Sequence, residues 1–423
     1  MTTTPLTITG VSAIEILDSR GNPTVRTFLD TAGAPRATAG VPSGASTGSR
    51  EAVELRDGDP SRFDGKGVMH AVENVNGEIA DMLRSRTWET LAELDAALID
   101  LDGTPNKGRL GANAILGVSM AAARAFAGDQ PLWRSLQPDG VAPRLPVPHF
   151  NVLNGGVHAP NQLEFQEFML APVGAPSYAE AVRAGATVYS VLRGILRSRG
   201  EATGLGDEGG FAPEIATPEA VLHVIVEAIA KAGYEAGPRG IAIALDPAAS
   251  EFYRDGTYQL AGEALTSAQL TERYASIIDH YPVWSIEDPL AEGDWDGWVS
   301  LTERLADRVQ VMGDDIFVTN PAIIAEAISR KVGNSALIKL NQIGTVTETL
   351  EAQRLCREAG YTQMISHRSG ETEDSFIGDL AVATGTGQIK SGAPARGERV
   401  AKYNRMLEIA RRHPELPYGL TTR

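Results

Sequence analysis

The chain has almost no cysteine. Its 423 residues include a single one, Cys356, which cannot form a disulfide within the chain. Because Cys356 lies in a helical pattern (EAQRLCREAG), we expect a packed thiol and not a nucleophile. Structural disulfides belong to oxidising compartments, so this composition fits a cytoplasmic protein.

Long apolar runs are also lacking. No stretch approaches the roughly 18 apolar residues that a membrane-spanning helix needs. The first ten residues (MTTTPLTITG) contain neither a basic region nor an apolar segment, so we expect no signal peptide. We therefore expect no membrane insertion and a cytoplasmic location.

Positive charge is in deficit. The chain has 38 lysines and arginines against 54 acids, which gives a net charge of −16. This charge argues against nucleic acid or an anionic membrane surface as a partner. If the substrate is a small anion, bound cations and a local cluster of basic side chains must overcome the overall field.

The composition that remains is that of a globular protein, with 43% hydrophobic and 22% charged residues. A chain of this length exceeds one typical core, so we expect two domains. Four prolines in residues 137–150 mark the connection between them. We predict a small N-terminal α+β domain over 1–137, a proline-rich linker over 138–146 and a β/α barrel over 147–423.

The expected elements follow from local patterns. The N-terminal part has strand-like stretches near 6–16 and 24–30 and helical patterns around 66–84 and 112–127. After the linker, strand-like runs alternate with helices, of which 217–233, 320–333 and 347–360 are the best signalled. This alternation predicts βαβ units and a parallel sheet.

Six apolar stretches in the second half each run into an ionisable residue. These residues are Asp246, Glu287, Asp314, Lys339, His367 and Lys390. Their spacing is about one strand plus one helix, and a β/α barrel delivers catalytic groups from the C-terminal ends of its strands into one mouth. Three acids and two lysines there suggest a divalent metal beside a lysine base.

Asp246, Glu287 and Asp314 are the candidate metal ligands. Hard carboxylate oxygens suit Mg²⁺, and a divalent ion relieves the repulsion among three acids. Any one of them alone could be a solvated or helix-capping acid. Asp288 and Asp315 adjoin two of them, and the sequence leaves open which member of each pair points inward.

Lys339 follows three apolar residues and should point into the mouth. It can act as a base near neutral pH only if its pKa falls, which burial, a nearby divalent ion and Lys390 would favour. The alternative is a lysine that extends to solvent, as most lysines do.

Five longer motifs resemble those of enolases. They are DSRGNPTV (18–25), VPSGASTG (41–48), GDEGGFAP (206–213), KLNQIG (339–344) and SHRSGETED (366–374). The resemblance runs from about residue 8 to about 410. It implies an enolase-type barrel and the reversible dehydration of 2-phosphoglycerate to phosphoenolpyruvate by a Mg²⁺-dependent homodimer or larger assembly. A lysine base with one or two Mg²⁺ ions is the known pattern of that superfamily, so we match this role and do not derive it.

The resemblance also implies roles for individual residues. Lys339 would remove the C2 proton, and Glu208, helped by Glu167, would protonate the departing hydroxyl. This requires a raised pKa at Glu208, caused by Glu167 or by burial. Asp246, Glu287 and Asp314 would hold the first Mg²⁺, which also binds the substrate carboxylate, and Ser46 would ligate a second ion that arrives with substrate. The residues implied to surround the phosphate and carboxylate are His158, Arg368, Ser369 and Lys390. Loops 42–48, 154–161 and 250–264 could close as lids.

The chain departs from the enolase pattern at several positions. Enolases usually place a glutamate after NPTV and an arginine in the C-terminal helix, and these form an ion pair across the dimer interface. Here the matching residues are Arg26 and Glu408, so we expect a pair of reversed polarity, against the alternative of two unrelated surface changes. The departures near the site are Val157, Pro160, Pro247 and Ser391. They leave two alternatives: a paralogue acting on a related phosphonate, such as a carboxyphosphonoenolpyruvate synthase, and a non-catalytic binding protein.

Overall fold

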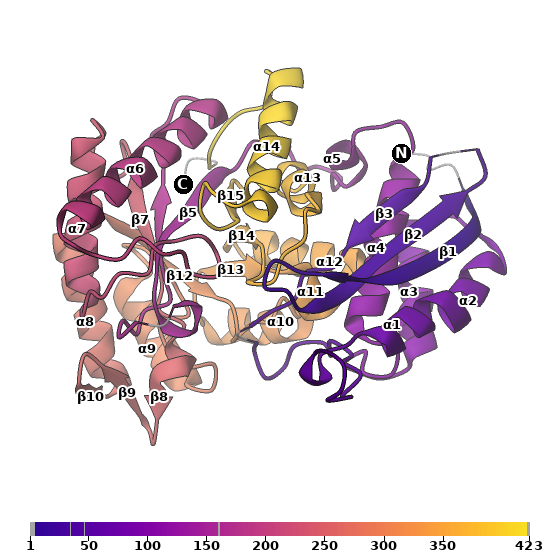
Figure 1. Cartoon of the computed structure of the whole chain (residues 1–423), viewed down its shortest axis with the longest axis horizontal. Helices are drawn as coiled ribbons and strands as arrows, with labels where there is room; N and C mark the ends of the chain where they lie inside the picture. The colour runs from indigo at the N-terminus through magenta and orange to yellow at the C-terminus, as the bar shows by residue number, and fades with distance from the viewer. Residues whose placement is uncertain (1–4, 34, 46, 160, 421–423) are drawn as a thin grey trace.

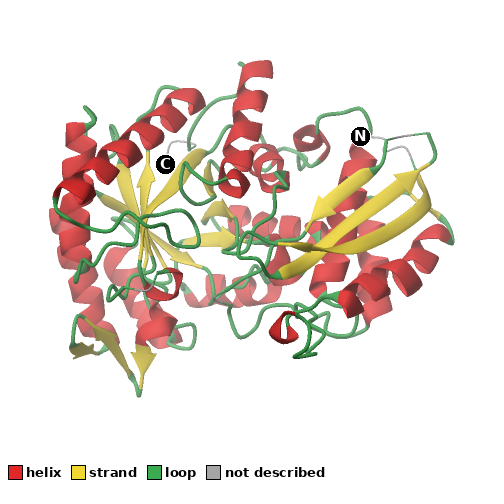
Figure 2. Ribbon diagram, viewed as in Figure 1, coloured by secondary structure: helices red, strands yellow, loops and turns green. Residues whose placement is uncertain are grey.

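The computed structural model describes residues 5–33, 35–45, 47–159 and 161–420. Two parts lie side by side: a sheet with helices from the N-terminal third, and a closed barrel built from the rest (Figure 1, Figure 2). Ser46 and Pro160, which the sequence analysis singled out, lie outside the described residues.

The N-terminal part is built on a four-stranded antiparallel sheet in the order β3-β2-β1-β4. The strands are β1 (Leu6–Leu17), β2 (Pro23–Thr31), β3 (Ala37–Gly40) and β4 (Thr87–Trp88). Helix α4 (Ala112–Ala127) packs on β2 and β3, as its mostly apolar sequence requires. Gly117 permits this close approach, because a Cβ there would overlap the Thr27 hydroxyl.

The other N-terminal helices are short. The predicted helix over 66–84 is split into α1 (Met69–Asn74) and α2 (Ala80–Arg84) by a π-helical stretch, Val75–Ile79, with non-helical dihedrals at Gly77. Next come α3 (Leu91–Asp102) and α5 (Leu132–Ser135). Residues 136–146 carry no helix or strand, and we keep the division into two domains and a linker as a proposal.

The barrel is closed, in the strand order β11-β12-β13-β14-β15-β5-β6-β7. Its strands are β5 (Val147–Asn154), β6 (Glu167–Ala171), β7 (Ala242–Asp246), β11 (Val283–Glu287), β12 (Gln310–Gly313), β13 (Ser335–Ile338), β14 (Thr362–Ser366) and β15 (Gln388–Lys390). The predicted β/α barrel is confirmed, but the sheet is not wholly parallel, since β6 runs antiparallel to β5 and β7. In its described residues, the connection from β5 to β6 contains only a 3₁₀ turn, η3 (Gly156–His158), and a parallel pairing would need a longer crossover.

Helices cover the barrel. They are α6 (Tyr178–Ser198), α7 (Pro218–Lys231), α8 (Ser267–His280), α9 (Trp295–Leu305), α10 (Pro321–Arg330), α12 (Val346–Glu358), α13 (Phe376–Ala383) and α14 (Gly397–Arg412). The predicted N-caps are confirmed, because the side chains of Thr217 and Asn320 accept hydrogen bonds from backbone N–H groups in the first turns of α7 and α10. The short elements are η1 (Phe63–Gly65), η4 (Ala249–Phe252), β8 (Tyr253–Arg254), β9 (Thr257–Leu260), β10 (Glu263–Leu265) and α11 (Leu340–Ile343).

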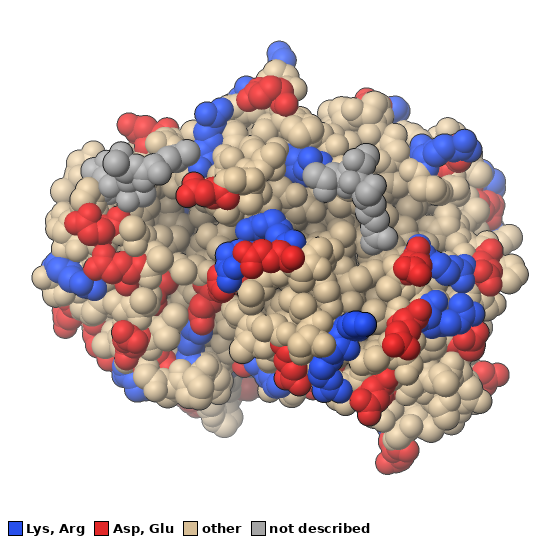
Figure 3. Space-filling model, turned by 180° about the vertical axis from the view of Figure 1, so that it is seen from behind, with Lys and Arg blue, Asp and Glu red and all other residues tan. Residues whose placement is uncertain are grey.

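Cys356 and the molecular surface agree with the composition. Cys356 is buried in α12, and burial raises its pKa to about 12, as expected of a packed thiol. Among the described helices, none combines the length and apolar character that crossing a membrane demands. On the face seen in Figure 3, many lysine and arginine side chains lie beside acidic ones.

Candidate active site

The strand-end residues meet at one end of the barrel. Each of the six predicted positions is the last residue of its strand or the residue that follows it. The antiparallel course of β6 places its first residue, Glu167, at the same rim, where it pairs with Asp246 of β7. The carboxyl groups that line this mouth are those of Glu167, Glu208, Asp246, Asp288, Asp314 and Asp315. The described lining residues include three lysine or arginine side chains, those of Lys339, Arg368 and Lys390.

Lys390 lies between acids from three strands. Its Nζ is 3.0 Å from Asp246 Oδ2, 2.8 Å from each Glu287 oxygen and 3.1 Å from Glu167 Oε1. Burial lowers the pKa of Lys390, but the surrounding carboxylates outweigh it and raise the pKa well above its usual range. Lys390 is therefore a cation held among these acids at the end of β15.

Lys339 pairs with a different acid. Its Nζ lies 2.5 Å from Asp314 Oδ2, and Asp314 Oδ1 accepts a hydrogen bond of 2.8 Å from Gln342 Nε2. Burial is the largest single effect on the pKa of Lys339 and lowers it, but the carboxylates of Asp314 and Glu287 act in the opposite direction and the net direction is upward. The expected fall of this pKa is not found, because the neighbouring acids outweigh the contributions of Lys390 and Arg368.

The predicted metal ligands are divided between the two lysines. Asp246 and Glu287 contact Lys390, whereas Asp314 contacts Lys339. The acids left open by the sequence, Asp288 and Asp315, are buried as well. Asp288 accepts the backbone N–H groups of Asp314 and Asp315 at 2.8 and 2.9 Å. Ligand atoms of Asp288, Asp314 and Asp315 lie within 4.8 Å of one another, so the structure brings together a trio that shares only Asp314 with the predicted one.

These acids suit a divalent cation on chemical grounds. Burial, together with the neighbouring acid Asp246, raises the pKa of Glu287 well above its usual range. Burial and Asp315 do the same for Asp288. Six carboxyl groups facing three cations leave an excess of buried negative charge, which protons or hard cations must balance.

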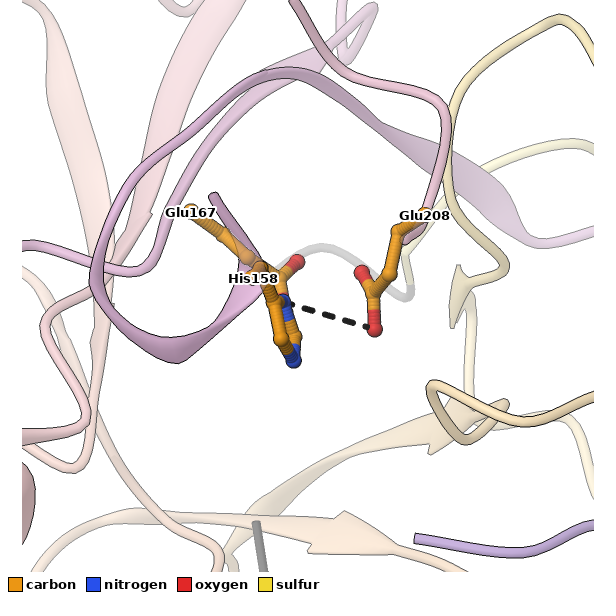
Figure 4. Close-up of side chains that lie close together, drawn as sticks. All are labelled: His158, Glu167 and Glu208. Carbon is orange, nitrogen blue, oxygen red and sulfur yellow. Dashed lines mark ion pairs between the residues drawn. The ribbon is translucent and has the colours of Figure 1, made fainter. Parts of the chain in front are cut away.

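A second cluster consists of His158, Glu167 and Glu208 (Figure 4). Nδ1 of His158 is 3.9 Å from a carboxyl oxygen of each glutamate. Burial and Glu208 raise the pKa of Glu167 well above its usual range. Burial also opposes ionisation of Glu208, but His367, His158 and Arg399 outweigh it and hold the pKa of Glu208 well below its usual range. The expected raised pKa at Glu208 is therefore wrong for this arrangement, in which the raised pKa is that of Glu167.

His367 is held by a residue that the sequence analysis missed. Nη1 of Arg399, at the start of α14, lies 2.5 Å from His367 Nδ1. Because a guanidinium can only donate, Nδ1 accepts and the imidazole proton is on Nε2, which lies 3.2 Å from Glu208 Oε2. Burial lowers the pKa of His367 to about 4, so the ring is neutral at pH 7. Arg399 also donates to the backbone carbonyls of Ser369 and Asp207 and so joins two of the enolase-like motifs.

Arg368 and Ser369 connect the mouth to the N-terminal part. Arg368 makes a bidentate pair with Glu51, at 2.9 and 3.0 Å. Ser369 Oγ accepts the backbone N–H of Ala45 at 2.7 Å. Gly44 is required here, because a Cβ would overlap the Arg368 guanidinium. Within the described part of loop 42–48, these contacts hold the loop against the barrel mouth. Glu51 had no motif signal and was also missed.

Comparison with known proteins agrees with this architecture. The sequence model "Enolase, N-terminal domain" matches residues 8–136, and "Enolase, C-terminal TIM barrel domain" matches residues 142–415. The chain belongs to the enolase family. It is 58% identical over 406 residues to a protein of Acidothermus cellulolyticus (strain ATCC 43068 / DSM 8971 / 11B) named enolase. The matched region covers 95% of this chain and 94% of the relative. As an enolase-family member, the chain is a lyase.

Proposed function

We propose that this enolase-family protein is a phosphopyruvate hydratase, which reversibly dehydrates 2-phosphoglycerate to phosphoenolpyruvate. The observation that carries the proposal is that one mouth holds an amine, Lys339, and two carboxyl groups, Glu167 and Glu208, whose pKa values are shifted in opposite directions. Loss of water from adjacent carbons needs a base at one carbon and an acid at the other. Family membership supports the same chemistry.

Lys339 is the proposed base for the C2 proton. Lys339 follows β13 directly, and its side chain is only 12% exposed, so the amine is largely shielded from bulk water. Asp246, Glu287 and Asp314 would hold a first Mg²⁺ and Ser46 a second, and such ions supply positive charge beside the two negative charges that build up on the substrate carboxylate. If Asp314 ligates Mg²⁺, its carboxylate attracts the Lys339 proton less and raises the pKa of Lys339 less. The lysine then comes closer to the neutral form that a base needs.

The pair of Glu167 and Glu208 is the proposed acid. Hydroxide is a poor leaving group, so the C3 hydroxyl must receive a proton as it departs. The raised pKa of Glu167 makes it the better proton store of the two, and His158 Nδ1 lies 3.9 Å from a carboxyl oxygen of each glutamate. We propose that the proton reaches the substrate oxygen through Glu208, with His367 Nε2–H stabilising the carboxylate left behind.

The remaining mouth residues are proposed to bind the substrate anion. Lys390 offers a buried ammonium to the carboxylate, and Arg368 offers a planar fork to the phosphate, with Ser369 and His158 beside it. The negative overall charge makes this local positive group necessary. A homodimer in the cytoplasm is part of the same proposal. In the single chain, Arg26 pairs with Glu373 at 2.8 Å and Glu408 with Arg405 at 3.3 Å.

One observation favours the second candidate, a paralogue that acts on a related phosphonate. Val157 is 49% exposed directly beside His158, where an apolar side chain of this size has no role in packing. Pro247 and Ser391 adjoin Asp246 and Lys390 and leave both site residues in place. A non-catalytic binding protein would not need the full set of acids and lysines that the mouth retains.

The test is the ultraviolet absorbance of enol formation. Purified protein is mixed with 2-phosphoglycerate and Mg²⁺, with a chelator control. We expect fast turnover that the chelator abolishes and that excess Mg²⁺ restores. Turnover that persists under chelation contradicts the metal assignment. Absent turnover in folded, Mg²⁺-binding protein contradicts the hydratase assignment, and turnover of a phosphonate analogue then supports the paralogue.

A further inference from the structure

A second hollow lies at the opposite end of the barrel from the candidate active site. We call it the basal bowl. It is bordered by Val147, Ala242, Val283 and Gln310, which begin β5, β7, β11 and β12. The proposed catalytic groups lie at the other ends of these strands, so the barrel itself separates the two hollows. The volume of the bowl is about 950 Å³, which is ample for a small-molecule ligand.

The basal bowl is cationic in an acidic protein. Arg144, Arg308 and Arg357 line it, and no aspartate or glutamate is among its described lining residues. Arg308 is paired with Asp279 at 2.5 Å. Arg144 donates to the backbone carbonyl of Gly419 at 2.7 Å, and neither Arg144 nor Arg357 takes part in an ion pair within the described ranges. The third arginine of the bowl, Arg308, is thus neutralised by a carboxylate, whereas Arg144 and Arg357 are not.

Burial makes these two charges costly. Loss of solvent lowers the pKa of both Arg144 and Arg357. Both stay protonated because the guanidinium is a very strong base. Nη1 of Arg357 is also buried without a hydrogen-bond partner in the described part of the chain. A partly dehydrated cation without an ion-pair contact destabilises the fold, and an anion bound beside it would offset that cost.

Apolar and aromatic side chains make up much of the remaining wall, together with uncharged glutamine and threonine side chains such as Gln310 and Gln363. Trp284 stacks one face on His149, with ring centres 5.6 Å apart and an interplanar angle of 15°. Its Nε1–H is buried and has no acceptor among the described residues. The side chains of Val173, Pro282 and Val309 form an apolar part of the wall of the bowl. The lining therefore matches a ligand that combines one negative group with an apolar or aromatic body, and matches a bare inorganic ion poorly.

We propose that the basal bowl is a binding site for a small organic anion. Its negative group is held by Arg357 with Arg144, and its apolar or aromatic body lies against Trp284 and the neighbouring wall. The site is distinct from the barrel mouth, and the proposal does not rest on the hydratase assignment.

The probe is 8-anilinonaphthalene-1-sulfonate, an aromatic anion whose fluorescence rises in apolar surroundings. Titrated into the full-length protein, it is expected to bind saturably at one site, and saturating 2-phosphoglycerate with Mg²⁺ should not displace it. Arg357→Gln should weaken binding about tenfold, since a hydrogen bond to a charged group is lost. The matched control is Arg354→Gln on the same helix. Arg354 lies outside the bowl and pairs with Glu351 and Glu358, so this variant should bind like the unmodified chain.

A neutral probe separates an anion site from a merely apolar one. N-phenyl-1-naphthylamine has the same body without the sulfonate, and it should bind about tenfold more weakly than the anionic probe and be insensitive to Arg357→Gln. Arg144→Gln serves as the second variant if circular dichroism shows that Arg357→Gln is unfolded. The proposal is overturned if the folded arginine variants bind the anion like the unmodified chain, if both probes bind equally, or if 2-phosphoglycerate displaces the anion.

Discussion

Asp95 is an acid that folding buries completely, where α3 meets α12. Its Oδ2 accepts the backbone N–H and the hydroxyl of Thr347 at 3.0 and 2.6 Å. Burial raises the pKa from 3.8 to about 6, against the effect of these hydrogen bonds. Because the folded pKa lies above the unfolded one, the associated stability is fully present below pH 3.8 and is lost as the pH rises through 6.

The size of this loss follows from the shift. About two pKa units correspond to about 3 kcal/mol of unfolding free energy, at 1.36 kcal/mol per unit. Asp95→Asn keeps an oxygen acceptor for Thr347 and cannot ionise. It should therefore stabilise the protein by about 3 kcal/mol at pH 8 and change little near pH 4.

Urea unfolding followed by circular dichroism at pH 4, 6 and 8 measures the difference. The matched control is Asp100→Asn, an exposed acid on the same helix, which should change stability little at any pH. A gain at pH 8 below about 1 kcal/mol, or an equal gain at pH 4, would refute the reasoning that burial of the charge dominates.

Three further outcomes are expected. Lys339→Ala should abolish exchange of the C2 proton of 2-phosphoglycerate with solvent while calorimetry still detects Mg²⁺ binding, and persisting exchange would remove Lys339 from the role of base. Arg399→Gln should release His367 and the two loops, lowering kcat about tenfold or more with a smaller change in KM and altering the imidazole nitrogen signals in NMR spectra. An unchanged tautomer would contradict the positioning role. Arg26→Glu and Glu408→Arg should each weaken the dimer in ultracentrifugation, and the double variant should recover it. Without recovery, the two residues do not pair.

The sequence predicted those parts of the site that lie on regular elements. A parallel strand followed by a helix repeats at a regular interval, so a charged residue at the end of each apolar stretch could be assigned to one rim. All six assigned residues, from Asp246 to Lys390, lie there. The starts of two helices could also be predicted from the sequence, because Thr217 and Asn320 cap the first turns of α7 and α10 through local contacts.

Contacts between residues far apart in the chain could not be predicted from the sequence. The antiparallel direction of β6 goes with a short connection whose described residues form only a 3₁₀ turn, and the pattern of apolar residues does not reveal this. Arg399 and Glu51 act on loops far away in the chain, and their local sequences resemble those of exposed charged residues. The pKa order of Glu167 and Glu208 depends on which cations and imidazoles face each carboxyl group, and this is known only once the side chains are placed.

The way the barrel closes has a consequence for protein synthesis. The barrel is closed by the pairing of its first strand, β5, which begins at Val147, with its last strand, β15, which ends at Lys390. Closure therefore links segments that are far apart in the chain. During translation the antiparallel β5, β6 and β7 emerge early and can pair with one another, but β15 emerges almost last. Lys390 itself lies on this closing strand. A nascent chain therefore cannot hold its acids around their central ammonium until nearly the whole polypeptide has left the ribosome, and a truncated product should lack the complete site.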